Sequence, residues 1–190
     1  MNGKFIKTIF ISILVLFFNL DCSMPEKERK NFKVQVDRFA DLEILRYQVP
    51  GFEDLSLRQK KFVYFLSQAS LSGRDIIYDQ NYRYNLIIRR TIHNIIKNYN
   101  GDKKLDSWKQ FVNYAKRVWF SNGIHHHYST MKIIPEFEES YFEDLIYNSE
   151  GEFPVNPGES LDQFILRIIP IIFNPEIDSK RVNLDPDDDI

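Results

Sequence analysis

Few residues of this chain have types and spacings that could support chemistry, and the histidines are the most unusual of them. Three of the four, His125, His126 and His127, are consecutive. In an extended segment His125 and His127 would point to the same side, where two neutral imidazoles can share a metal ion. The alternative is a loop in which these rings pack and hydrogen-bond locally. No histidine is followed by glutamate, so the two-histidine helix motif of many zinc peptidases is missing.

Other candidate catalytic groups are weaker. Ser160 lies in a Gly-Glu-Ser-Leu-Asp run that has half of a nucleophile-elbow motif, but the spacing from Ser160 to Gln163 also fits a helix capping box. Glu139 and Glu143 are one helical turn apart, and such pairs usually lie on a solvated face. No glycine-rich phosphate loop occurs. The residues alone therefore give no complete active site.

Composition limits the class of protein. The chain has 190 residues, with 25 Lys and Arg against 27 Asp and Glu, for a formal charge of −2. A nucleic-acid-binding protein normally carries a basic face, so this balance argues against nucleic acid as a partner. Aromatic residues make up 15%, whereas glycine (7) and proline (8) are scarce, as expected for a folded, mainly helical chain. A single cysteine allows no disulfide within the chain.

The N-terminus has the pattern of an export signal. Lys4 and Lys7 precede thirteen uncharged, mostly apolar residues, 8–20. As a helix this stretch would be roughly 20 Å long, too short for a hydrocarbon core of about 30 Å. A basic lead before a short apolar stretch is typical of a secretory signal, which we assign to residues 1–22. A buried core helix is the alternative.

Cys22 follows this stretch after one residue, Asp21, at the place where a bacterial lipoprotein has the cysteine that is acylated. The preceding residues, 19–21, are Asn-Leu-Asp and fit the usual lipoprotein pattern poorly, so lipidation and plain export both stay open. Residues 23–31 are polar and charged, which suits a linker. The remaining residues, 32–190, form the expected folded part.

The folded part reads as short strands followed by helices. Alternation at residues 32–37, and strand-forming residues over 39–49, predict two strands, the first half-buried through Phe32, Val34 and Val36. Apolar stripes at helical spacing predict helices, and we interpret the stripes as core. Pro170 is expected to kink or end the last helix. The predicted helices begin near Ser56 (with Phe62, Phe65, Leu66 and Ala69 inward), Tyr84, Leu105 (itself inward), Glu138 and Ser160, and Gly73 ends or bends the first.

Several long stretches resemble bacterial members of the dipeptidyl-peptidase III family of zinc metallopeptidases. The similarity covers nearly all of the chain after residue 31 and lies in long collinear segments. The most specific segment runs from Lys116 to Tyr128 (KRVWFSNGIHHHY). The others are residues 38–41 (RFAD), 45–52 (LRYQVPGF), 73–76 (GRDI), 84–86 (YNL), 88–91 (IRRT), 172–175 (IFNP) and 180–183 (KRVN).

The resemblance implies a two-lobed exopeptidase that removes dipeptides from the N-termini of short peptides. In the family, zinc is held by a His-Glu-x-x-Gly-His motif and a later glutamate, and the motif glutamate activates the metal-bound water. This chain contains neither, so no catalytic residue, general base or metal ligand is carried over, and zinc is expected only for the full-length enzyme. The implied fold is α+β and predominantly helical, as the N-terminal part, truncated at its C-terminus, of the lobe opposite the zinc.

The resemblance also suggests where substrate binds. The family loop after the Trp119-containing helix faces the substrate cleft, which predicts peptide contacts from Asn122, His125, His126, His127 and Tyr128. The alternative is that this loop only closes against its own lobe. The implied protein is exported, and is periplasmic or anchored in the bacterial envelope through Cys22. A non-catalytic envelope lipoprotein that binds peptides or a partner is the alternative function.

Truncation would have a structural consequence. If the rest of an enzyme is missing, the helix from Ser160 and the tail after Pro175 are expected to be the most loosely packed parts. The helices between Leu57 and Phe120 are then expected to resist protease better than these parts do.

Overall fold

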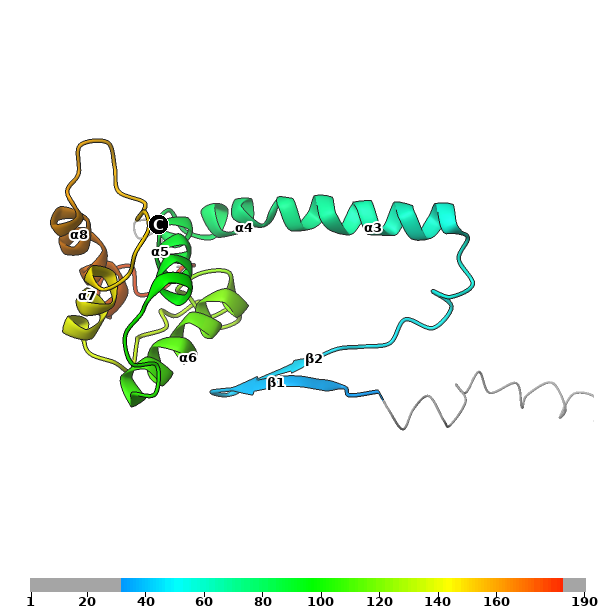
Figure 1. Cartoon of the computed structure of the whole chain (residues 1–190), viewed down its shortest axis with the longest axis horizontal. Helices are drawn as coiled ribbons and strands as arrows, with labels where there is room; N and C mark the ends of the chain where they lie inside the picture. The colour runs from blue at the N-terminus through cyan, green and yellow to red at the C-terminus, as the bar shows by residue number, and fades with distance from the viewer. Residues whose placement is uncertain (1–31, 183–190) are drawn as a thin grey trace, which may run out of the picture. The chain divides into compact units, whose positions relative to one another are not determined.

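The computed structural model describes residues 32–182 (Figure 1). The chain divides into two compact units, Met1–Gln48 and Val49–Ile190. About half of the described structure is helical and its sheet has two strands, which confirms a predominantly helical α+β fold. The predicted export signal, with Cys22, and the linker lie outside the described residues. Among the helices that the structure describes, none is long and apolar enough to cross a membrane.

The described part of the first unit is a β-hairpin. Strand β1 (Gln35–Phe39) pairs antiparallel with β2 (Leu42–Leu45), and Ala40 turns the chain with a φ of 47°. Strand β1 begins three residues later than predicted, and β2 is shorter than the predicted 39–49. The prediction that the first strand is half-buried on one face is wrong as well, because Val34 and Val36 are 48% and 50% exposed. Within the described part of this unit the hairpin has no further layer against which to bury them.

The second unit has a core between four helices. They are α5 (Asn85–Asn98), α6 (Asp106–Ser121), α7 (Glu139–Tyr147) and α8 (Leu161–Phe173). All four were predicted within a residue or two, and their inward positions are mostly confirmed; Leu105 is the exception, at 46% exposure. The buried stripe residues include Ile88, Ile92, Ile95, Trp108, Ala115, Phe142, Leu145, Phe164, Ile165 and Ile168.

Helix α8 is buried along nearly its whole length, so the expectation that it would be loosely packed is wrong. Its buried residues extend past Pro170 to Phe173. Pro170 does not end the helix, and Asn174 N–H donates to the Pro170 carbonyl at 3.0 Å. The carbonyl that loses a donor to Pro170 is that of Leu166, four residues earlier, and the Leu166 side chain is 74% exposed. Burial of the apolar residues on both sides of Pro170 therefore outweighs one missing helix hydrogen bond.

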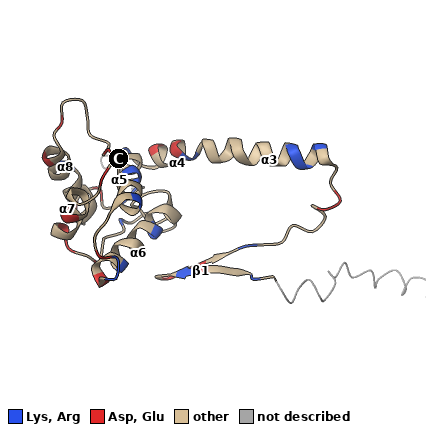
Figure 2. Cartoon of the chain, viewed as in Figure 1, with Lys and Arg blue, Asp and Glu red and all other residues tan. Residues whose placement is uncertain are grey.

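Helices α3 (Leu57–Ser72) and α4 (Arg74–Asn81) precede this core, and Gly73 separates them as predicted. The capping box that begins α3 is confirmed, but its inward stripe is wrong, because no residue of α3 is buried. Residues 62–72 carry no charge, and Figure 2 shows this uncharged stretch along α3. The exposed apolar residues of α3 are Leu57, Phe62, Val63, Tyr64, Phe65, Leu66 and Leu71.

Candidate functional site

The predicted peptide-contacting loop begins where α6 ends. Asn122 adopts the left-handed conformation with a φ of 53°, and Gly123 N–H returns to the Val118 carbonyl at 2.9 Å. The buried Asn85 holds the next residue, since its Oδ1 accepts from Ile124 N–H at 3.0 Å. A Cβ at Gly123 would collide with the Asn85 amide. The Asn-Gly pair is therefore required both to end the helix and to bring the loop against α5.

The loop then forms a small backbone ladder. His125 pairs antiparallel with Lys132, and Met131 pairs with Lys180 from the C-terminal segment. Hydrogen bonds from Ile133 N–H to Ile124 at 2.7 Å and from Lys132 N–H to Ser179 at 2.8 Å hold the three segments together. The tail after Pro175 is thus tied to the loop through its described residues, instead of packing loosely as expected.

His125 lies inside this ladder, only 2% exposed. Its Nε2 is 2.7 Å from the Asp178 carbonyl oxygen, and its ring meets Tyr82 edge-on at 5.0 Å. A carbonyl oxygen can only accept, so Nε2 carries the proton and Nδ1 is left as an acceptor with no partner among residues 32–182. Burial lowers the pKa of His125, against the opposing effect of the Asp178 carbonyl. The imidazole is therefore neutral at pH 7.

Asp178 is the centre of the contacts that fix the C-terminal segment. Its carboxylate accepts a hydrogen bond from the Tyr82 hydroxyl and lies 3.8 Å from the Arg83 guanidinium. Burial raises the pKa of Tyr82, and the hydrogen bond to Asp178 adds to this. Lys132 Nζ donates to the carbonyls of Asn174, at 2.8 Å, and Ile177. These contacts position the loop and leave His125 covered.

The other loop side chains lie nearer the surface. His126 Nδ1 accepts from the backbone N–H groups of Tyr128, at 3.3 Å, and Ser129, at 3.1 Å, so this ring closes its own turn. The His127 ring packs against Phe120 at 4.9 Å and Tyr128 at 4.6 Å. Tyr128 is 85% exposed. The structure thus gathers His126, His127 and Tyr128 into one aromatic surface with Phe120, and keeps His125 away from it.

The triple histidine does not form a metal site in this geometry. Over residues 32–182, no three His, Cys, Asp or Glu side chains come together as a metal ion would require. His125 is buried with Nε2 engaged, whereas His127 packs on Phe120. The described residues therefore do not fit zinc, and no chemistry is assigned to zinc on them.

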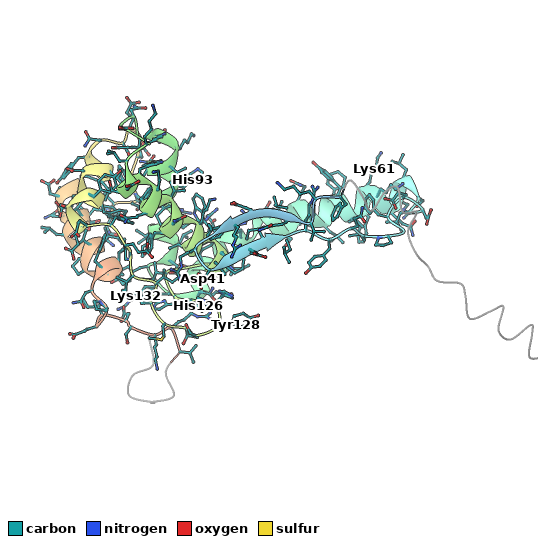
Figure 3. All side chains as sticks on the ribbon, turned by 90° about the horizontal axis from the view of Figure 1, so that it is seen from below. Asp41, Lys61, His93, His126, Tyr128 and Lys132 are labelled. Carbon is teal, nitrogen blue, oxygen red and sulfur yellow. The ribbon has the colours of Figure 1, made fainter. Side chains whose placement is uncertain are left out.

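Of the predicted contact residues, Asn122 lines a cavity that α4, α5 and the end of α6 form, and none of the three consecutive histidines lines it. The Trp119 cavity, of about 490 Å³, is lined by Arg74, Tyr78, Arg89, His93, Trp119 and Asn122. The adjoining Phe153 cavity, of about 430 Å³, shares Arg89 and His93 and adds Arg90, Lys97 and Phe153, among others. Figure 3 shows His93 well apart from His126 and Tyr128. This face was not predicted from the sequence, in which the signal available was the helical spacing of Arg89 and His93, four residues apart.

Neither the models of known protein families nor the curated proteins give a match to this chain.

Proposed function

We propose that this chain is the N-terminal part of an exported peptidase similar to the dipeptidyl-peptidase III family, which releases N-terminal dipeptides from oligopeptides. In this proposal the chain belongs to the lobe opposite the zinc and forms part of the wall of the substrate cleft. Zinc and the general base come from the rest of the enzyme, so no catalytic step is assigned to a residue of this chain.

Helix α3 is the observation that carries the proposal. Its side chains from Phe62 to Leu66 are five consecutive apolar residues, each between 44% and 65% exposed. Consecutive residues of a helix point in all directions, and a helix that is apolar all round is normally buried on every side. A helix of this kind needs more protein around it than the described residues provide, as it would have within a larger lobe.

The loop after α6 supports the position of the substrate. The aromatic surface of Phe120, His126, His127 and Tyr128 is open at Tyr128, which is 85% exposed. An exposed phenol can cover an apolar side chain of a peptide, and the imidazoles can hydrogen-bond its backbone. Asn122 and His125 keep this loop in place through the contacts of their backbone and ring, so in the proposal they act as positioning residues.

A non-catalytic envelope lipoprotein that binds a peptide or a partner is the second candidate, and the same exposed α3 favours it. The two functions differ in what the gene encodes after Ile190. An open frame with a His-Glu-x-x-Gly-His motif supports the peptidase. A stop codon together with a stable, monodisperse chain supports the binding protein.

The activity test compares the 190-residue chain with the product of the whole reading frame. We expect zinc-dependent hydrolysis of dipeptidyl arylamides by the longer product and none by the chain alone, with or without zinc. Turnover by the chain alone would overturn the proposal. In the longer product, Tyr128→Ala should raise KM roughly three- to tenfold with little change in kcat, because it removes binding without touching the reacting atoms.

A matched control is available for this variant. Tyr47, in the other unit, is 80% exposed, so Tyr47→Ala removes an equally open phenol from a different place. An unchanged KM in Tyr47→Ala, beside the increase in Tyr128→Ala, assigns the effect to the cleft wall. Equal effects in both variants, or none in either, would remove Tyr128 from the substrate site.

A further inference from the structure

We propose that the two cavities along α5 form one binding site for a small aromatic oxyanion, with its carboxylate or phosphate group at Arg89 and its ring against Trp119. The site shares Asn122 with the start of the loop, its lining contains none of the three consecutive histidines, and it does not rest on the peptidase proposal. It is argued from the charges, the side-chain types and the size of the two cavities.

The charge of the lining is strongly positive. Arg74, Arg89, Arg90 and Lys97 give four cations, and Figure 2 shows basic residues along α5. One carboxylate, Glu152, lines the Phe153 cavity, and a second, Asp75, pairs with Arg89 and Arg90. Four cations against two carboxylates leave an excess of two positive charges, which an anionic ligand would neutralise.

Arg74 and Lys97 are the cavity residues that leave this positive charge unbalanced. Within residues 32–182 neither has an ion-pair partner, although each lines a cavity that Arg89 also lines. A bound oxyanion would give these two cations the counter-ion that residues 32–182 do not provide.

Arg89 is held in place before any ligand arrives. Its guanidinium pairs with Asp75 and lies 5.0 Å from the centre of the Tyr78 ring. Arg90 reaches the other oxygen of Asp75 at 3.2 Å. A guanidinium has five N–H donors, so an arginine anchored by one carboxylate keeps donors for a second, and its planar fork suits carboxylate and phosphate alike. Holding Arg89 in advance lowers the entropy lost on binding.

The other residues that line the two cavities indicate the chemistry of the rest of the ligand. Trp119 and the buried Tyr78 give aromatic surface in the Trp119 cavity, and His93 and Asn122 give hydrogen-bonding groups. Volumes of about 490 and 430 Å³ lie in the range of small-molecule sites, about 300–1,000 Å³. An aromatic surface beside several cations fits a ligand that has a small ring and an oxyanion group. An inorganic ion alone would make no contact with the aromatic surface.

The test is calorimetric titration of the purified chain at low salt with benzoate, phenyl phosphate, benzamide and inorganic phosphate. We expect one or both aromatic anions to bind, benzamide to bind at least tenfold more weakly because it lacks the charge, and inorganic phosphate to bind more weakly than phenyl phosphate. The affinity should fall as salt is added. The stronger of benzoate and phenyl phosphate identifies the oxyanion.

Variants locate the site. Arg89→Gln should weaken the aromatic anion about tenfold or more, and Arg74→Gln and Lys97→Gln several-fold each. Lys104→Gln removes an exposed cation that lines neither cavity and should leave the affinity unchanged, which controls for net charge. Equal binding of benzamide and benzoate, equal losses in Lys104→Gln and Arg74→Gln, or no binding of either aromatic anion would overturn the proposal. Inorganic phosphate binding as tightly as phenyl phosphate would overturn the aromatic part of it.

Discussion

Helices α3 and α8 begin in the same way. In each, a serine caps the helix and a glutamine three residues later bonds back to it: Gln Oε1 accepts from the serine N–H at 2.9 Å in both. The serine Oγ in turn accepts from the glutamine N–H, at 3.4 Å in α3 and 3.2 Å in α8. Yet α3 buries no residue, whereas α8 buries most of its length.

The sequences of the two helices explain only part of this difference. Residues 62–66 of α3 and residues 168–173 of α8 are all apolar, so each helix has a stretch that is apolar on every side, although α3 also carries Arg58, Lys60 and Lys61 and is the more polar helix overall. Helix α8 is surrounded by the aromatic and aliphatic residues of the α5–α7 core, among them Phe137 and Phe142, which contact Phe173. The apolar stretch of α3 at residues 62–66 has no such surroundings among the described residues. The comparison teaches that a local signal fixes where a helix begins, whereas its burial depends on what the rest of the protein brings to it.

The largest effect expected from this comparison is on unfolding. Ile168 is fully buried, and Ile168→Ala should lower the free energy of unfolding of the chain by about 2–5 kcal/mol, because it removes buried methyl groups and leaves a cavity. Leu66, 53% exposed in α3, is the matched position, and Leu66→Ala should change that free energy by less than about 0.5 kcal/mol. Urea denaturation measures both.

A comparable loss in Leu66→Ala and Ile168→Ala would contradict the comparison, since it would place α3 against the core in solution. In the longer enzyme of the proposed function the expectation changes, and Leu66→Ala should then be costly as well. The pair of variants thus also reports whether further protein covers α3.

Much of the fold followed from signals within a few residues of each other. Ser56 and Ser160 mark helix starts through their glutamines, Asn122 with Gly123 marks the end of α6, and the spacing of Ile88, Ile92 and Ile95 marks a buried stripe. Each of these features depends on backbone geometry or periodicity that a short window contains.

The rest depends on partners distant in sequence. His125 is buried because the chain returns 53 residues later and places Asp178 at its Nε2. The α5 cavities need α4 and the end of α6 to lie beside Arg89 and His93, whereas the Arg89-Arg90 pair on its own has the pattern of an ordinary solvated face. No local pattern contains such contacts, and the same limit led to the wrong inward stripe of α3.

The caps offer a smaller and sharper test of the same comparison. Ser160→Ala should lower the free energy of unfolding by about 1 kcal/mol, because α8 belongs to the cooperative core. Ser56→Ala removes the equivalent cap from α3 and should leave global unfolding unchanged, while amide exchange in the first turn of α3 becomes faster. Hydrogen exchange read residue by residue, beside urea denaturation, distinguishes the two. Equal global losses in the two variants would mean that α3 and α8 unfold together.

The smallest effect concerns the pH dependence at the start of α8. Arg167 donates to both oxygens of Glu159, at 2.6 and 2.7 Å, and Asn156 N–H donates at 2.7 Å. The Arg167 hydrogen bonds, with that of Asn156, lower the pKa of Glu159 to about 2. A carboxyl whose folded pKa is depressed stabilises the fold above its unfolded pKa of about 4.3, and this contribution is lost as the pH falls toward about 2.

The melting temperature of Glu159→Gln should therefore lie below that of the parent chain at neutral pH, and the gap should close between about pH 4.5 and pH 2. Glu53, just before α3, is the control: Lys60 Nζ bonds to its backbone carbonyl at 2.7 Å, which Glu53→Gln keeps. That variant should follow the parent at every pH. A constant gap for Glu159→Gln would mean that the carboxylate does not anchor α8, and a pH-dependent gap for Glu53→Gln would mean that the approach to α3 is anchored electrostatically too. The N-termini of α3 and α8 would then be alike in their electrostatics, and the two helices would differ only in the protein that packs around them.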